Sequence, residues 1–275
     1  MKITDISGKV NLCNGVEMPY LGLGVYQLTD GQEVDAIKWA LEIGYRHIDT
    51  AMIYRNEAGV GKAINSSEVK REEIFVTTKV WNSDQGYFST LKAFDKSLQE
   101  LNLDYIDLYL IHWPKPNSAD TWRAMEKLYN EKRVRAIGVS NFMKNHLEDL
   151  FKTANIKPMV NQMEFNPYVV QQDLIDFCSS NKIQYESWSP FMQGKLFQLG
   201  LLDNLTTKYQ KSITQIILRW NLQKGVIAIP KSSTRSRIRQ NADIFDFELS
   251  AADVALIDSL ENGQRSGPDP NNFDF

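Results

Sequence analysis

The sequence predicts an α/β fold of the (β/α)₈ TIM-barrel class, and three observations carry that prediction. The chain has 275 residues, near the usual size of such a barrel. Short apolar runs rich in β-branched residues alternate with helical patterns, which favours a parallel sheet. One βα unit takes about 30 residues, so eight units nearly exhaust the chain and favour a closed barrel over an open sheet. The eight runs are centred near Leu23, Ile48, Val76, Tyr109, Ile137, Val160, Tyr185 and Ile227.

Helical periodicity fills the intervals between these runs. Apolar residues recur at helical spacing, and Gly44 is placed to end the first helix. The widest interval, before Ile227, predicts a long loop near Ser189–Leu202. The clearest patterns predict helices over Glu33–Ile43, Phe88–Leu101, Thr121–Tyr129 and Thr214–Gln223.

Two segments lie outside the eight-fold plan. Lys9–Met18 contains Asn14-Gly15, a two-residue turn signal that predicts a β-hairpin before the barrel. Ser250–Leu260 predicts an extra C-terminal helix, in which Ser250 is the N-cap and Asp253 takes the capping-box position.

No linker interrupts the pattern, so we expect one domain over residues 1–275, with an irregular tail over the Gly- and Pro-rich residues 263–275.

A net charge of −3 excludes a basic field over the whole protein of the kind that binds nucleic acid or anionic lipid. Cys13 and Cys178 form no CxxC pair, and no run approaches the roughly 20 apolar residues of a membrane helix. We therefore expect a cytoplasmic protein without nucleic-acid or membrane partners, and a monomer is the default expectation.

Polar side chains stand at the carboxyl end of most of the apolar runs. These ends share one face of a parallel barrel, the face on which active sites lie. A single polar strand end is explained as a turn residue, but seven in succession with this chemistry are not. The second to eighth runs end at Asp49, Lys79, His112, Ser140-Asn141, Gln162, Trp188-Ser189 and Lys231-Ser232.

Four side chains at these ends suit proton transfer to a carbonyl oxygen. A free tyrosine has a pKa near 10, too high for easy proton donation at neutral pH. A Lys79 ammonium about 4 Å from Tyr54 would favour the tyrosinate by about 4 kcal/mol, which is about 3 pKa units before desolvation. Asp49 would hold Lys79 in place, and His112 would donate a hydrogen bond to the carbonyl. The group predicts reduction of C=O by a hydride from a separate donor.

Each of these residues also has a purely structural interpretation. Asp49 and Lys79 could be an ion pair of the core, Tyr54 a half-buried packing residue and His112 a satisfied core histidine. Their combination at neighbouring strand ends favours the functional interpretation.

Three ordered motifs resemble signatures of the aldo-keto reductase superfamily. Residues 44–51 (GYRHIDTA), followed by Tyr54, Glu57 and Gly61, resemble the first, and residues 134–142 (VRAIGVSNF) resemble the end of the second. Residues 229–232 (IPKS), with Arg237, resemble the third. The resemblance spans about residues 10–260 and implies a (β/α)₈ barrel capped by an N-terminal hairpin. The loop over Lys115–Ala119 and the C-terminal tail are short, which is similar to bacterial members that reduce methylglyoxal or 2,5-diketo-gluconate.

The resemblance implies NADPH as the cofactor and a small aldehyde or ketone as the substrate. It makes Tyr54 the general acid, Lys79 and Asp49 the pair that tunes its pKa, and His112 the residue that orients the carbonyl. The implied nicotinamide contacts are Ser140, Asn141, Gln162 and the stacking Trp188, and Ser189 with the following loop would cover the pyrophosphate. The implied adenosine contacts are Lys231, Ser232, Ser233, Arg237, Gln240 and Asn241, and the implied substrate pocket is Tyr26, Ile53, Trp81 and Trp113.

Residues 231–239 form the densest cationic run of the chain. Arg and Lys form charge-assisted hydrogen bonds to phosphate, so this run favours NADPH over NADH, although it could be a solvated basic helix face.

Gly22 and Gly24 begin a GxGxxG pattern that ends in Gln27, so a Rossmann site is not supported. The three histidines are scattered and predict no metal site.

Two other functions remain open at this point. A non-catalytic barrel that binds nicotinamide nucleotide as a sensor or partner subunit would have no need of Tyr54. A barrel isomerase or aldolase would use Lys79 as a Schiff-base nucleophile, and pairing with Asp49 makes that lysine a poor nucleophile.

Overall fold

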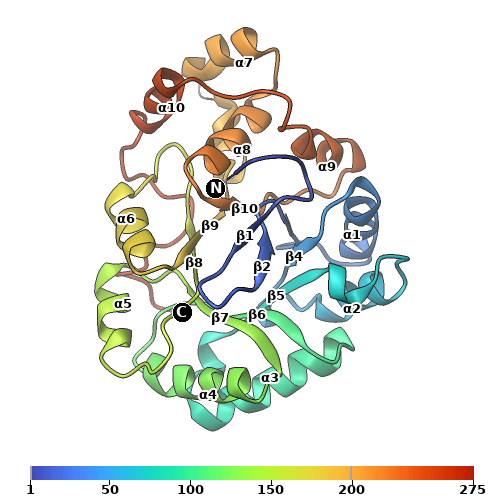
Figure 1. Ribbon diagram of the computed structural model, residues 1–275, viewed down its shortest axis with the longest axis vertical. Helices are drawn as coiled ribbons and strands as arrows, with labels where there is room; N and C mark the ends of the chain where they lie inside the picture. Colours follow the sequence, from blue (N-terminus) through green and yellow to red (C-terminus); the bar gives the residue numbers. More distant parts are fainter. Residues whose placement is uncertain (1, 199) are drawn as a thin grey trace.

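The computed structural model describes residues 2–198 and 200–275. A ring of parallel strands lies at its centre and helices surround the ring (Figure 1). The sheet order is β10-β9-β8-β7-β6-β5-β4-β3, so each strand pairs with its neighbour in the chain. The strands are β3 (Leu23–Gly24), β4 (His47–Asp49), β5 (Phe75–Val80), β6 (Ile106–Ile111), β7 (Val134–Ser140), β8 (Val160–Glu164), β9 (Gln184–Trp188) and β10 (Ile227–Ala228). Every predicted run centre lies in one of them, and the predicted (β/α)₈ barrel is confirmed.

The seam between the first and last barrel strands depends on two glycines. Isolated parallel bridges pair Leu21 with Ala228 and Gly24 with Lys231. Gly22 N donates to Ala228 O at 2.8 Å, and Gly24 N donates to Pro230 O at 3.2 Å. A Cβ atom on Gly24 would lie 2.9 Å from Ile229 O, closer than real Cβ contacts. The glycine pattern that ends in Gln27 therefore serves barrel closure.

The helices cover the outside of the sheet. The first ends as predicted, because Gly44, at φ 116°, donates its N–H to Ala40 O and Leu41 O. The four predicted helices correspond to α1, α3, α4 and α8, and α4 begins three residues before the predicted Thr121. The helices are α1 (Gln32–Ile43), α2 (Glu57–Asn65), α3 (Tyr87–Leu101), α4 (Ser118–Asn130), α5 (Lys144–Phe151), α6 (Gln172–Ser180), α7 (Asp203–Tyr209), α8 (Ile213–Gln223), α9 (Arg235–Ala242) and α10 (Ala251–Asp258).

Short 3₁₀ turns occupy several of the connecting loops. The loop predicted over Ser189–Leu202 contains two of them, and Leu199 lies outside the described residues. Another carries Tyr54 directly after β4. The turns are η1 (Met52–Tyr54), η2 (Arg71–Glu73), η3 (Asn82–Asp84), η4 (Met192–Gln198) and η5 (Gly200–Leu202).

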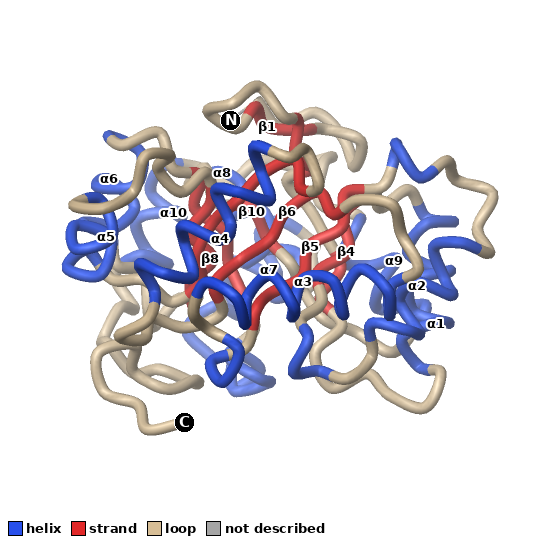
Figure 2. The backbone as a smooth tube through the Cα atoms, turned by 90° about the horizontal axis from the view of Figure 1, so that it is seen from below, coloured by secondary structure: helices blue, strands red, loops and turns tan. Residues whose placement is uncertain are grey.

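The N-terminal hairpin forms, but its turn differs from the prediction. Strands β1 (Lys9–Asn11) and β2 (Glu17–Pro19) pair antiparallel. Leu12 N donates to Val16 O, and Gly15 N donates to Leu12 O, both at 2.9 Å. The loop therefore has three residues with Gly15 alone at positive φ, 85°, because a turn closed by a left-handed glycine replaces the two-residue Asn14-Gly15 loop. Figure 2 shows the hairpin over one end of the strands and the C-terminus beyond the other.

The C-terminal helix α10 begins at the predicted cap. The Ser250 hydroxyl accepts a hydrogen bond from Asp253 N at 3.2 Å and donates to Asp253 Oδ2 at 2.6 Å. The tail over residues 263–275 contains neither helix nor strand and crosses the carboxyl end of the barrel. In the described part of the chain, no helix is long and apolar enough to cross a membrane.

Candidate functional site

A cavity of about 1110 Å³ opens at the carboxyl ends of the strands. Size and position fit a ligand site of this fold. Every predicted site residue lines it except Lys79, which is fully buried beneath its floor. The predicted residues that line it are Tyr26, Asp49, Ile53, Tyr54, Trp81, His112, Trp113, Ser140, Asn141, Gln162, Trp188, Ser189, Lys231, Ser232, Ser233, Arg237, Gln240 and Asn241.

Lys79 and Asp49 form a buried ion pair between neighbouring strands. Lys79 Nζ donates to Asp49 Oδ1 at 2.6 Å and to Thr50 O at 2.9 Å. Burial raises the pKa of the Asp49 carboxyl, while the attraction of Lys79 and hydrogen bonds from Lys79 and Gln162 oppose the rise. The Lys79 ammonium is therefore held by fixed acceptors, and it has no access to the cavity as a Schiff-base nucleophile.

Tyr54 lies above this pair, and its loop is tied to the barrel. The buried Asn56 donates to Val25 O at 2.9 Å and accepts from the Thr50 hydroxyl at 2.7 Å, which fixes the segment after β4. Lys79 Nζ lies 5.4 Å from the centroid of the Tyr54 ring. The geometry keeps the phenol over a buried cation.

The expectation that Lys79 lowers the pKa of Tyr54 is wrong for this structure. Burial, with smaller contributions from the Asp49 carboxylate and from Tyr26, raises the pKa of Tyr54 well above its usual value. The physical reason is that the charge of Lys79 is already engaged by Asp49, so desolvation of the phenolate dominates. Tyr54 therefore carries its proton at neutral pH.

His112 follows β6 and faces Tyr54. The two rings meet edge to face with centroids 5.7 Å apart, and the Trp81 ring also meets the imidazole edge to face, with centroids 5.1 Å apart. Burial, and then the charge of Lys79, lower the pKa of His112 well below its usual value. The imidazole is therefore neutral at physiological pH and holds one N–H for donation.

The Asn141 side chain links three elements of the cavity. Its amide donates to His112 O at 3.0 Å and to the Ser140 hydroxyl at 3.1 Å, and its carbonyl accepts from Trp188 Nε1 at 3.0 Å. Asn141 and Ser189 both have positive φ, 65° and 50°, a conformation that non-glycine residues adopt rarely. Such backbone conformations are concentrated at functional sites. Trp188 is therefore held edge-on to the Asn141 amide.

The far end of the cavity carries exposed cations. Lys231 and Arg237 line the cavity, and within residues 2–198 and 200–275 neither forms an ion pair. Arg235, on the same helix α9, is instead paired with Glu42 at 2.8 Å. Unpaired Arg and Lys beside the Ser232 hydroxyl provide the donors that a phosphate requires. The residues present therefore fit the 2′-phosphate end of NADPH.

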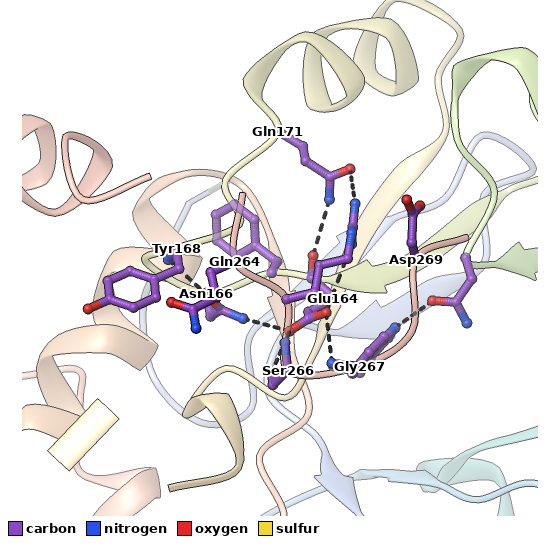
Figure 3. Close-up of polar contacts among 12 residues, drawn as sticks. Glu164, Asn166, Tyr168, Gln171, Gln264, Ser266, Gly267 and Asp269 are labelled. Atoms are coloured by element: carbon purple, nitrogen blue, oxygen red, sulfur yellow. Dashed lines mark hydrogen bonds and ion pairs between the residues drawn. The ribbon is translucent and has the colours of Figure 1, made fainter. Parts of the chain in front are cut away.

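The anchoring of the C-terminal tail was not predicted from the sequence. Glu164, the fully buried last residue of β8, accepts hydrogen bonds from Ser266 N at 2.6 Å and Gly267 N at 3.2 Å, and from the Ser266 hydroxyl (Figure 3). The Arg265 guanidinium lies 3.9 Å from the same carboxylate. A Cβ atom on Gly267 would lie 2.4 Å from the Trp188 ring. The anchored tail therefore packs directly against Trp188.

Beyond this anchor the tail forms an aromatic wall of the cavity. The Phe275 ring is parallel to Trp81 at 5.8 Å and edge-on to Trp113 at 5.2 Å, and Phe273 contacts Trp113 at 5.0 Å. These contributions were missed because the tail has no periodicity. Two aromatic residues in a tail rich in Gly, Pro, Asn and Asp were the available signal.

The comparisons with known proteins agree with this geometry. Residues 20–262 match the family model described as "Aldo/keto reductase family". The chain is 56% identical over 274 residues to glyoxal reductase of Bacillus subtilis strain 168, with 99% of each chain covered. It is 44% identical over 269 residues to methylglyoxal reductase DkgA of Escherichia coli K12, covering 96% of this chain and 97% of that one. A solved structure of a Gox0644 mutant in complex with NADPH superposes with a TM-score of 0.92 at 38% identity, covering 98% of this chain and 99% of the other.

Proposed function

Because the chain belongs to the aldo/keto reductase family and is an NADPH-dependent oxidoreductase, we propose that it reduces small aldehydes and ketones to alcohols with Tyr54 as the general acid. One observation supports this above the others. A single cavity has a protonated phenol and a neutral imidazole next to a buried ion pair at one end, and the exposed cations Lys231 and Arg237 at the other. When bound, NADPH supplies the hydride.

The proton is the contribution of the chain itself. As the carbonyl oxygen gains negative charge, the Tyr54 hydroxyl donates its proton to it, and the neutral His112 donates a hydrogen bond that orients the oxygen. An alkoxide is a stronger base than a phenolate, so the raised pKa of Tyr54 keeps the proton available until charge develops. The tyrosinate left behind faces the Lys79 cation, which Asp49 holds in position.

Cofactor binding is divided between the two ends of the cavity. Ser140, Asn141 and Gln162 offer hydrogen-bonding groups for a carboxamide, and Trp188 offers an aromatic face. Lys231, Ser232 and Arg237 offer charge-assisted donors for the 2′-phosphate. We assign Ser189 to the pyrophosphate, Ser233 to the phosphate end, and Gln240 and Asn241 to the adenine.

The substrate class follows from the walls and from the relatives. Tyr26, Ile53, Trp81 and Trp113 surround the space next to Tyr54, and Phe275 narrows it. Such walls suit small or flat carbonyl compounds. Since relatives at 56% and 44% identity are named glyoxal reductase and methylglyoxal reductase, we propose 2-oxoaldehydes as preferred substrates.

A screen of NADPH oxidation tests the proposal, with methylglyoxal, glyoxal, aromatic aldehydes, keto-sugars and steroids as substrates. Methylglyoxal and glyoxal are expected to give the highest kcat/KM. Tyr54→Phe keeps the ring and removes the proton, so kcat is expected to fall by about 10²- to 10⁴-fold while the Kd for NADPH stays within twofold. Wild-type turnover by Tyr54→Phe would remove Tyr54 from the mechanism. Absence of turnover with every carbonyl, despite NADPH binding, would favour a sensor.

A further inference from the structure

A second buried carboxyl group lies beneath the cavity, and the proposed reduction makes no use of it. Glu186 on β9 is the direct strand partner of Gln162 on β8, and its side chain is fully buried. Unlike Asp49, Glu186 does not line the cavity. Its contact with Gln162 is its main polar contact.

The amide of Gln162 is held by two carboxyl groups. Its Nε2 donates to Asp49 Oδ2 and to Glu186 Oε2, each at 2.8 Å, and these bonds use both N–H groups of the amide. The reverse orientation would place Oε1 against Asp49 Oδ2, an acceptor oxygen of the carboxylate that is paired with Lys79, so Asp49 fixes which end of the amide is which. No described residue donates a hydrogen bond to Oε1, and Gln162 lines the cavity. The amide therefore offers its acceptor to the cavity.

Among residues 2–198 and 200–275, no cation is paired with the Glu186 carboxyl. Lys79 is engaged by Asp49, and His47 Nε2 lies 3.7 Å from Glu186 Oε1, beyond hydrogen-bond distance. Burial and then the nearby Asp49 raise the pKa of Glu186 to about 8, and burial and then Lys79 lower the pKa of His47 to about 3. At neutral pH both groups are uncharged. Glu186 thus accepts from Gln162 without adding a second negative charge beside Asp49.

We propose that Glu186 is a positioning residue for cofactor binding, which together with Asp49 holds the Gln162 amide so that Oε1 meets an N–H donor of the nicotinamide carboxamide. The inference depends on the role proposed above for Gln162. An apolar side chain at position 186 leaves Asp49 as the sole acceptor. The amide then keeps one of its two hydrogen bonds and turns more freely about its soft terminal torsion, so Oε1 is held less firmly toward the cavity.

Calorimetric titration with two probes tests this idea without turnover. NADP⁺ contains the nicotinamide, whereas 2′-phospho-ADP-ribose lacks it and retains the phosphate end. In Glu186→Leu, the Kd for NADP⁺ is expected to rise by about 3- to 10-fold, which corresponds to the loss of one neutral hydrogen bond. The Kd for 2′-phospho-ADP-ribose is expected to stay within about twofold of the wild-type value. Glu186→Gln keeps an acceptor toward Gln162 and is expected to behave as wild type. Glu186→Met replaces Glu186→Leu if the leucine variant does not fold.

Two further variants separate the possible failures. Glu57→Gln alters another buried carboxyl, bonded to Thr78 and Ser97 outside the barrel interior, and is expected to leave the ratio of the two Kd values unchanged. Gln162→Leu is expected to weaken NADP⁺ selectively, and Glu186→Leu to add nothing in that background. Selective weakening by Gln162→Leu but not by Glu186→Leu overturns the role of Glu186 alone. If Gln162→Leu changes neither Kd, the proposed role of Gln162 is overturned. If Glu186→Leu weakens the binding of both probes equally, Glu186 has a structural role only.

Discussion

The two ends of the cavity hold their charges in opposite ways. At the Tyr54 end, Lys79 and Asp49 are 2.6 Å apart and almost fully buried. At the other end, Lys231 and Arg237 are exposed, and neither is engaged in an ion pair within the described residues. A buried charge with a fixed partner shapes the local field at no cost of reorganisation, whereas an exposed unpaired charge is available to a ligand. Under the proposed function, the buried pair at the Tyr54 end prepares the proton transfer, and the exposed cations at the other end bind the cofactor.

The largest effect is expected where the buried pair is broken. Lys79→Met leaves the Asp49 carboxyl buried without its cation, so the free energy of unfolding is expected to fall by about 3–5 kcal/mol. Urea denaturation at neutral pH measures it. Adding Asp49→Asn to Lys79→Met removes the uncompensated group and is expected to restore part of the loss.

An exposed pair of the same length provides the matched control. Lys152 Nζ lies 2.6 Å from Asp149 Oδ1, but both side chains are 72% exposed. Lys152→Met is expected to leave the urea midpoint unchanged, because solvent screens such pairs. If Lys79→Met lowered the free energy of unfolding no more than Lys152→Met does, the stability of the Tyr54 end would not depend on its buried ion pair.

The next effect concerns the binding end. Arg237→Ala removes a charge-assisted donor, so the KM for NADPH is expected to rise by about 10- to 100-fold with little change in the KM for NADH. Steady-state kinetics with one aldehyde and both cofactors measure this difference. Arg239→Ala, which removes the same charge from the same helix away from the cavity, is expected to leave both values unchanged. Equal rises for the two cofactors with Arg237→Ala would refute the 2′-phosphate assignment.

Much of this division could be predicted from the sequence. Parallel strands place their carboxyl ends on one face, so Asp49, His112 and Gln162 were expected together before any coordinates, and all three line the cavity. The hairpin and the α10 cap follow from local turn and capping chemistry, which acts within a few residues.

The remainder depends on contacts between distant residues. That Glu164 anchors the tail depends on residues about a hundred positions apart, which no local pattern encodes. Glu186 appeared as one polar residue inside an apolar run. The pKa of Tyr54 depends on how far burial outweighs the field of Lys79, and only the folded site determines that balance.

The last predicted effect is a pH dependence of stability that arises from the Glu186–His47 pair. Between about pH 4.5 and 6.5 the folded pair keeps one proton on Glu186, and the unfolded chain keeps one on His47, so stability does not change. Between about pH 6.5 and 8 the folded protein retains the proton on Glu186, whereas in the unfolded chain both Glu186 and His47 have lost theirs. Stability therefore falls as pH rises through this window, by about 2 kcal/mol for the 1.5 units that separate 6.5 from 8.

Glu186→Gln isolates this contribution, because it leaves His47 as the only titrating member of the pair. Its stability is expected to be level from pH 6.5 to 8 with respect to this pair, and to fall below pH 6.5 as the unfolded His47 takes up a proton that the folded one refuses. Urea denaturation of both proteins at pH 5.5, 6.5 and 8 measures the difference. The same alkaline loss in wild type and Glu186→Gln would mean that Glu186 is already ionised at neutral pH. A second negative charge would then lie beside Asp49. The buried charges at the Tyr54 end would no longer cancel, and the contrast with the exposed cations at the other end would not hold as described.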